Sequence, residues 1–233
     1  CVTVGGVAKG SGMIHPNMAT MLAFLTTDAA VEPADLQGLV SALVDDTFNM
    51  ITVDGDTSTN DMVVCLANGQ SLGPTLRPGT AGWEQFKEAL RWVMTYLAKA
   101  IARDGEGATK LVEIRVQGAP TRADARRIAR SIAGSNLVKT AIYGEDANWG
   151  RIFCAVGYSG VEFDPDKVDI YIGELQVAAG GQALPFDEAK ASEILRESDV
   201  QITVDLHQGS GEATAWTCDL TYDYIKINAS YRT

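Results

Sequence analysis

The chain has 233 residues and a formal net charge of −11, from 19 Lys and Arg against 30 Asp and Glu. This acidic balance excludes nucleic acid and anionic membrane surfaces as main partners, because both are recognised by clustered cations. With 46% hydrophobic and 21% charged residues, the composition is that of a packed globular protein, and no apolar run is long enough to predict a membrane span.

The hydrophobic periodicity predicts both helices and strands. Helical spacing covers residues 33–48, 83–101, 122–132 and 188–196. Apolar or alternating runs predict strands at 62–67, 111–117, 152–157, 168–172, 200–206, 213–220 and 222–228. Strands gathered towards the C-terminus, with helices between some of them, predict an α+β fold. The Gly118-Ala119-Pro120 turn predicts a boundary between one domain over 1–118 and a smaller one over 119–233.

The four cysteines are far apart and form no CxxC pair. Cys65 and Cys154 sit in apolar runs, which predicts buried free thiols. A reducing, cytoplasmic location follows from this cysteine usage.

The glycine-dense stretch at 5–14 is the most unusual part of the sequence. A phosphate-binding loop would need its lysine after the second glycine, but Lys9 precedes Gly10-Ser11-Gly12. A flexible loop explains the glycines but not the apolar run that follows. Thr20 stands at the head of that run, where a buried strand is predicted, and a Thr in such a place is usually structural.

Six motifs in order along the chain resemble those of the ornithine acetyltransferase family, also called glutamate N-acetyltransferase. They are KGSGMI (9–14), PNMATML (16–22), ITVDGDTSTND (51–61), DGEGATK (104–110), GEDANWGR (144–151) and NASYRT (228–233). The resemblance therefore extends over the whole chain. It implies the C-terminal, β-chain part of a self-cleaving precursor, with a layered α/β sandwich of the N-terminal-nucleophile type and a second, smaller α+β domain.

The resemblance also implies that the chain cuts its own Ala19–Thr20 bond, so that residues 1–19 belong to the α chain. Thr20 would then be the nucleophile and its freed α-amine the base, since an amine of reference pKa near 8 accepts a proton where an amide cannot. The implied reaction moves an acetyl group from N2-acetyl-L-ornithine to L-glutamate through acetyl-Thr20, without a cofactor. Whether acetyl-CoA is a second acetyl donor stays open.

Five positions match the family's substrate contacts: Lys9, Thr20, Glu106, Asn228 and Thr233. Lys9 suits a carboxylate, Glu106 an ammonium, and Asn228 offers both donors and an acceptor. The family's oxyanion hole lies in its upstream segment. The resemblance implies an α chain as partner and an α2β2 heterotetramer as the assembly.

Other interpretations remain open from the residues alone. Thr20 would equally serve an N-terminal-nucleophile amidase or aminopeptidase, with water as the acceptor. Cys1 is a rival nucleophile. A chain that stays uncut would instead be a non-catalytic assembly subunit. The acidic run at 54–61 lacks the glycine at loop position six and the terminal glutamate of an EF-hand calcium loop, which favours a hydrogen-bonded turn near the active site. His15 and His207 lie in unrelated contexts and do not predict a two-histidine metal site.

Overall fold

The structure is a computed structural model and describes residues 1–15 and 21–230. Its N-terminal half contains a three-stranded sheet of β1 (Val4–Lys9), β2 (Leu22–Thr27) and β3 (Met62–Ala67). The central strand β2 pairs antiparallel with β1 and parallel with β3. Part of the glycine-dense stretch is thus a strand and not a loop. A Cβ at Gly6 would lie 2.7 Å from the Leu25 side chain and 3.0 Å from that of Leu97, so a larger residue would displace these side chains.

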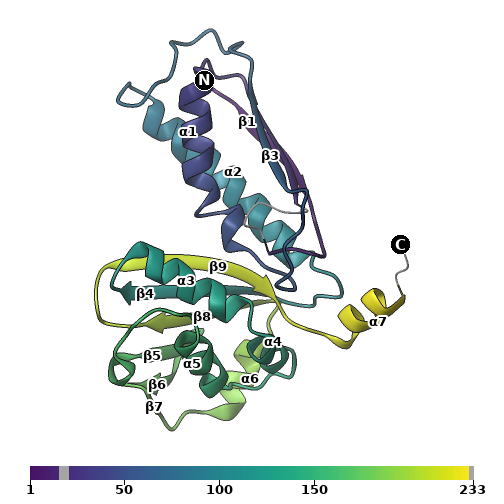
Figure 1. Cartoon of the computed structure of the whole chain (residues 1–233), viewed down its shortest axis with the longest axis vertical. Helices are drawn as coiled ribbons and strands as arrows, with labels where there is room; N and C mark the ends of the chain where they lie inside the picture. The colour runs from purple at the N-terminus through teal and green to yellow at the C-terminus, as the bar shows by residue number, and fades with distance from the viewer. Residues whose placement is uncertain (16–20, 231–233) are drawn as a thin grey trace.

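One face of this sheet is covered by α1 (Pro33–Val44) and α2 (Trp83–Arg103) (Figure 1). Leu90 and Met94 of α2 are fully buried, and each such side chain contributes about 1.5–3 kcal/mol to folding. The other face carries large apolar side chains in solvent, with Val7 66% and Leu66 60% exposed and Phe24 and Met62 beside them. The three-stranded sheet therefore has an apolar face that this chain leaves uncovered.

The second sheet has six strands in the order β7-β6-β5-β8-β4-β9. They are β4 (Leu111–Ala119), β5 (Asp169–Ile172), β6 (Leu175–Ala179), β7 (Gln182–Ala183), β8 (Asp199–Asp205) and β9 (Gly211–Cys218). The helices of this half are α3 (Arg122–Ala133), α4 (Asn136–Tyr143), α5 (Trp149–Gly157) and α6 (Glu188–Arg196). Helix α2 contacts strands of both sheets, which joins the two halves through one core.

The prediction of an α+β fold is confirmed, as are the four predicted helices and most of the predicted strands. Two strand predictions are wrong. Residues 152–157 belong to α5, which begins where the Asn148 side chain accepts the Arg151 N–H at 3.2 Å. Residues 222–228 belong to α7 (Tyr222–Ser230), whose first turn is capped by Thr221, with its Oγ1 accepting the Tyr224 N–H at 3.2 Å. A short apolar run does not distinguish a strand from a helix, and the caps decide for helix.

Cys154 is exposed on α5, so the prediction that its thiol is buried is wrong, and Cys65 is half-buried. The division into domains at residues 118 and 119 remains a prediction. That point lies at the end of β4, whose residues 111–119 pair within the six-stranded sheet, so the two sheets separate before β4. Among the helices of the described residues, none has both the length and the apolar character needed to cross a bilayer.

Candidate active site

The strand order places the start of β2 between Lys9 and Met62. Leu22 pairs with Lys9 on one side and with Met62 on the other. Met21, the first residue described after the predicted cleavage site, is buried. Its N–H donates to Asp61 Oδ1, and its carbonyl accepts the Met62 N–H at 2.8 Å. Met21 is thus hydrogen-bonded through both its backbone N–H and its backbone carbonyl.

Asp54 holds the end of the glycine-dense stretch in place. Its carboxylate accepts the Met13 N–H at 2.7 Å and the Ile14 N–H at 3.0 Å. The Ile14 carbonyl accepts the Val53 N–H at 2.7 Å. The same acidic run forms short turns, such as the Asp56 N–H to Asp54 Oδ1 at 3.2 Å, which confirms the predicted hydrogen-bonded turn. Asp54 therefore orders the backbone on the N-terminal side of the predicted cleavage site.

His15 is fixed by two polar partners. Its Nδ1 lies 3.0 Å from Thr52 Oγ1, and its Nε2 lies 2.8 Å from a guanidinium nitrogen of Arg130 on α3. Burial and the nearby Arg130 charge lower the pKa of His15 below its ordinary value of 6.5. The imidazole is therefore neutral at pH 7 and accepts from Arg130.

Glu106 lies in the turn that follows α2, against the glycine-dense stretch. Its N–H donates to the Ser11 carbonyl at 2.9 Å. A Cβ on Gly12 would stand 2.5 Å from the Glu106 carboxyl carbon, so only glycine permits this approach. Asn228 reaches the same carboxylate from α7, with its Nδ2 donating to Glu106 Oε2 at 2.9 Å.

The start of α7 is bound to the turn that carries Glu106. The Thr221 hydroxyl donates to the Gly107 carbonyl at 2.7 Å. Gly107 has a φ of +69°, and a Cβ there would lie 2.6 Å from the Tyr224 nitrogen. The Tyr224 hydroxyl lies 3.3 Å from Asp54 Oδ2, and burial together with the Asp54 charge raises the pKa of Tyr224 to about 12. Two predicted site motifs, 51–61 and 104–110, therefore meet α7, although α7 extends away from the sheets (Figure 1).

Among the five predicted substrate residues, Glu106 and Asn228 are in contact. Lys9 is exposed at the end of β1, two residues before the Ser11 carbonyl that binds the Glu106 N–H. Ala19, Thr20 and Thr233 lie outside the described residues. The described part of the site thus presents a cation, a carboxylate and an amide on neighbouring segments, a combination that suits a zwitterionic amino acid.

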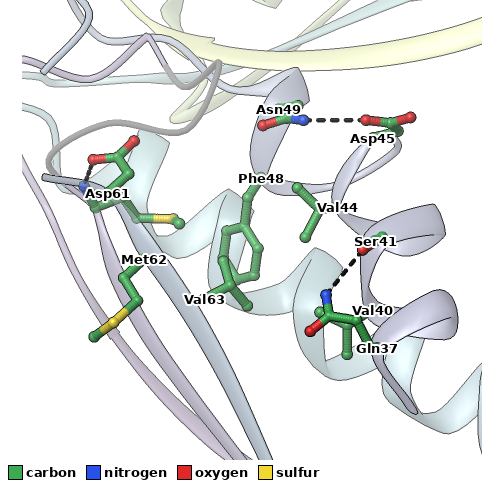
Figure 2. Close-up of a pocket in the computed structure, with 11 residues that line it drawn as sticks. Gln37, Val40, Ser41, Val44, Asp45, Phe48, Asn49, Asp61, Met62 and Val63 are labelled. Atoms are coloured by element: carbon green, nitrogen blue, oxygen red, sulfur yellow. Dashed lines mark hydrogen bonds between the residues drawn. The ribbon is translucent and has the colours of Figure 1, made fainter. Parts of the chain in front are cut away.

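A cavity of about 400 Å³ opens beside Met21 and Asp61, between β3 and α1 (Figure 2). Its walls carry mainly apolar and neutral polar side chains, among them Val40, Val44 and Phe48. None of its described lining residues is basic, and Lys9, Glu106 and Asn228 do not line it. The cavity therefore adjoins the start of β2 and is separate from those three residues.

Within residues 1–15 and 21–230, no group of three His, Cys, Asp or Glu side chains is arranged to hold a metal ion. His207, the second histidine, lies in the loop that follows β8, with its Nε2 2.9 Å from Asp169 Oδ2. That pairing is remote in the sequence from His15 and its Arg130 partner. The two histidines thus belong to separate local networks.

Three residues with contacts at this site, Asp54, Asp61 and Tyr224, have no individual role predicted from the sequence. Both aspartates stand in the 51–61 motif, so the available signal was their presence in that motif. Tyr224 carried no signal, because the segment around it was predicted as a strand.

Comparison with known proteins agrees with the motifs. The ArgJ family model matches residues 1–233. A protein named arginine biosynthesis bifunctional protein ArgJ, from Symbiobacterium thermophilum, is 62% identical over 232 residues, covering 100% of this chain and 58% of the relative. One of the same name from Geobacillus kaustophilus is 60% identical, covering 100% of this chain and 57% of the relative. The chain thus spans somewhat more than half the length of these relatives.

A solved structure gives the same answer for the fold. The crystal structure of arginine biosynthesis bifunctional protein argJ from Bacillus halodurans superposes with a TM-score of 0.90 at 54% identity, covering 91% of this chain and 100% of that chain. This likeness agrees with the layered α/β fold that the motifs implied. Since the family model matches every residue and the arrangement of sheets is shared, the chain belongs to the ArgJ family.

Proposed function

We propose that this chain is the C-terminal, nucleophile-bearing part of an acetyltransferase that moves the acetyl group of N2-acetyl-L-ornithine to L-glutamate. The observation that carries the proposal is the hydrogen bond between Asn228 and Glu106. The Glu106 carboxyl group lies against Gly12, which is close to Lys9 in the sequence. The names of the relatives, which place them in arginine biosynthesis, support this substrate class.

The proposed chemistry begins with cleavage of the Ala19–Thr20 bond, which frees the α-amine of Thr20. The Thr20 hydroxyl then attacks the acetyl carbonyl of acetyl-ornithine, and its proton passes to the α-amine. Ornithine leaves with that proton, and acetyl-Thr20 remains. Glutamate attacks this ester in the second half-reaction and leaves as N-acetylglutamate, which regenerates the hydroxyl and predicts ping-pong kinetics.

The described residues supply recognition in this scheme. The Lys9 ammonium pairs with a substrate carboxylate, and the Glu106 carboxylate accepts from a substrate ammonium. Asn228 holds Glu106 in place and shares its carboxylate with the substrate. Thr233 is proposed as a further substrate contact. Acetyl-CoA as an alternative acetyl donor belongs to the same proposal, and no cofactor takes part.

The coverage of the solved relative supports cleavage at Thr20. A fragment that begins at Thr20 contains 214 of the 233 residues, about 92% of the chain. The solved chain matches 91% of this chain and is itself matched over its full length. The matched length is thus close to that of a fragment that begins at Thr20.

The uncovered apolar face supports a partner chain. We propose that the part of the precursor beyond these 233 residues, which makes up about two fifths of the relatives' length, covers Val7, Phe24, Met62 and Leu66. Burial of such a face stabilises association through the hydrophobic effect. The proposed assembly is an α2β2 heterotetramer, and the proposed location is the cytoplasm.

Intact mass spectrometry on the full-length gene product tests the function. Wild type is compared with Thr20→Ala and with Thr26→Ala, whose threonine is exposed on β2. We expect wild type and Thr26→Ala to yield a fragment that begins at Thr20 and gains one acetyl group from acetyl-ornithine, while Thr20→Ala stays whole.

An uncut wild type that takes up no acetyl group would favour the non-catalytic assembly subunit. A cut enzyme that transfers its acetyl group to water and not to glutamate would instead be an amidase or aminopeptidase.

A further inference from the structure

Asp61 contacts the residue that follows the proposed nucleophile. The Met21 N–H donates to Asp61 Oδ1, and the next residue, Met62, donates its own N–H to the Met21 carbonyl at 2.8 Å. Asp61 stands immediately before β3, so the parallel pairing of β2 and β3 brings it to the head of β2. Figure 2 shows its carboxyl group beside Met62, with this hydrogen bond drawn.

The second oxygen of Asp61 is available for another partner. Asp61 Oδ2 is shielded from solvent and accepts no hydrogen bond from residues 1–15 or 21–230. A buried carboxylate oxygen without a donor is costly, because water no longer solvates it. The effect is visible in the pKa of Asp61, which burial raises from 3.8 to about 6. Among the described residues that line the adjoining cavity, the other acidic side chain is Asp45, at the end of α1.

Covalent geometry limits how far Thr20 lies from this carboxylate. The α-nitrogen of Thr20 is three bonds from the Met21 nitrogen, and bonds of about 1.3–1.5 Å keep those two nitrogens within roughly 4 Å in any conformation. Asp61 Oδ1 is bound to the hydrogen on that Met21 nitrogen. The amine that cleavage would free is therefore three covalent bonds from a nitrogen whose hydrogen Asp61 accepts.

We propose that Asp61 is a positioning residue for the nucleophile, whose Oδ2 accepts a hydrogen bond from the freed α-amine of Thr20. This inference rests on the proposed function. When Thr20 Oγ attacks the acetyl carbonyl, its proton moves to the α-amine, and the resulting ammonium pairs with the Asp61 carboxylate. The same proton then leaves with ornithine, so Asp61 stays ionised throughout and gains no proton. Its action is to orient the amine and to stabilise its charged form.

Asp61→Asn in the full-length precursor tests this role, because the amide keeps an oxygen for the Met21 N–H and removes the charge. Asp28→Asn is the matched control, since Asp28 Oδ1 accepts a backbone N–H, that of Thr3, at 2.7 Å beyond the far end of β2. We expect Asp61→Asn to lower kcat about 10- to 100-fold with KM for acetyl-ornithine within threefold of wild type. Asp28→Asn should leave kcat within twofold.

The pH dependence separates positioning from a merely structural role. In wild type both Asp61 and the amine must be unprotonated, so in acid, below the pKa values of both groups, the logarithm of kcat/KM should fall with a slope of two. In Asp61→Asn the slope should be one, because one titrating group is gone. A variant that keeps wild-type kcat and the slope of two would overturn the proposal.

If Asp61→Asn blocks self-cleavage, the same kinetics are measured on a complex co-expressed as two pieces, with the second starting at Thr20 behind a removable Met. Full kcat in that complex would likewise overturn the proposal. Failure of the proposed function has a different signature, since wild type itself would then take up no acetyl group.

Discussion

Asn228 Nδ2 donates to Glu106 Oε2 at 2.9 Å, joining the last turn of α7 to the turn after α2. These residues are 122 positions apart in the chain. The bond orients the Glu106 carboxylate, and in the proposed function Glu106 Oε1 accepts from a substrate ammonium. Two residues with unremarkable local sequence thus become a binding element only through the packing of α7 against Gly107.

Glu106→Gln should weaken binding of acetyl-ornithine. A hydrogen bond to a charged group contributes about 1.5–3 kcal/mol, so we expect KM to rise roughly 10- to 100-fold. Steady-state kinetics with Asn228→Ala and the double variant measure the coupling, which should make the double variant less impaired than the product of the two single effects. Glu212→Gln, whose glutamate is 4.0 Å from Arg115 on the surface, is the control. Equal KM values for Glu106→Gln and wild type would exclude Glu106 as a substrate contact.

Gly12→Ala should damage the site with little loss of stability. The added Cβ meets the Glu106 carboxyl group at 2.5 Å, and that group is the end of a flexible side chain that moves aside. We expect kcat/KM for acetyl-ornithine to fall about 10-fold, since the displaced carboxylate loses its Asn228 partner. The unfolding midpoint should change by less than about 2 °C.

Gly38→Ala is the control for Gly12→Ala, because an added Cβ on Gly38, within α1, has no neighbouring atom within 4 Å. It should leave kinetics unchanged and stabilise the protein by about 0.5–1 kcal/mol. Gly12→Ala with wild-type kcat/KM would show that the Glu106 carboxylate position does not matter for turnover.

In the uncut Thr20→Ala protein, where no freed amine pairs with the carboxylate, Asp61→Asn should raise stability at neutral pH. The pKa of Asp61 is about 6 in the folded protein and 3.8 in the reference state, so the folded state binds the proton more tightly. Stability from this group is complete below pH about 4 and is lost as the pH rises through 6. The neutral amide avoids that loss, which gives a gain on the order of 1–3 kcal/mol at pH 7 and about none at pH 3.5.

Urea unfolding at the two pH values measures this difference. A double variant that is less stable than Thr20→Ala alone at pH 7 would contradict the burial of an ionised Asp61 carboxylate. Higher stability, together with the lower kcat of Asp61→Asn in the cut enzyme, would show that wild type keeps a destabilising group at the head of β2 for activity.

Local pattern was sufficient for the elements whose apolar residues repeat over several turns. The periodicity of 83–101 predicted α2 almost to its end at Arg103, because each turn returns an apolar side chain to the same face. It failed at 152–157, where six apolar residues fit a strand or a helix equally and the Asn148 cap selected α5. It also missed α4, and it did not predict that Gly5 and Gly6 would pair in β1, since glycine has no side chain to pattern.

The sequence by itself determined the fold class, the motifs and most candidate site residues of this protein, because these depend on residue types at short spacing. Only the tertiary structure decided which of them meet: Asn228 with Glu106, Asp54 with Met13 and Tyr224, and Asp61 with Met21. Those contacts join segments that are 40 to 170 positions apart. Contacts at such separations depend on strand register and on helix packing through the common core, which no local pattern encodes.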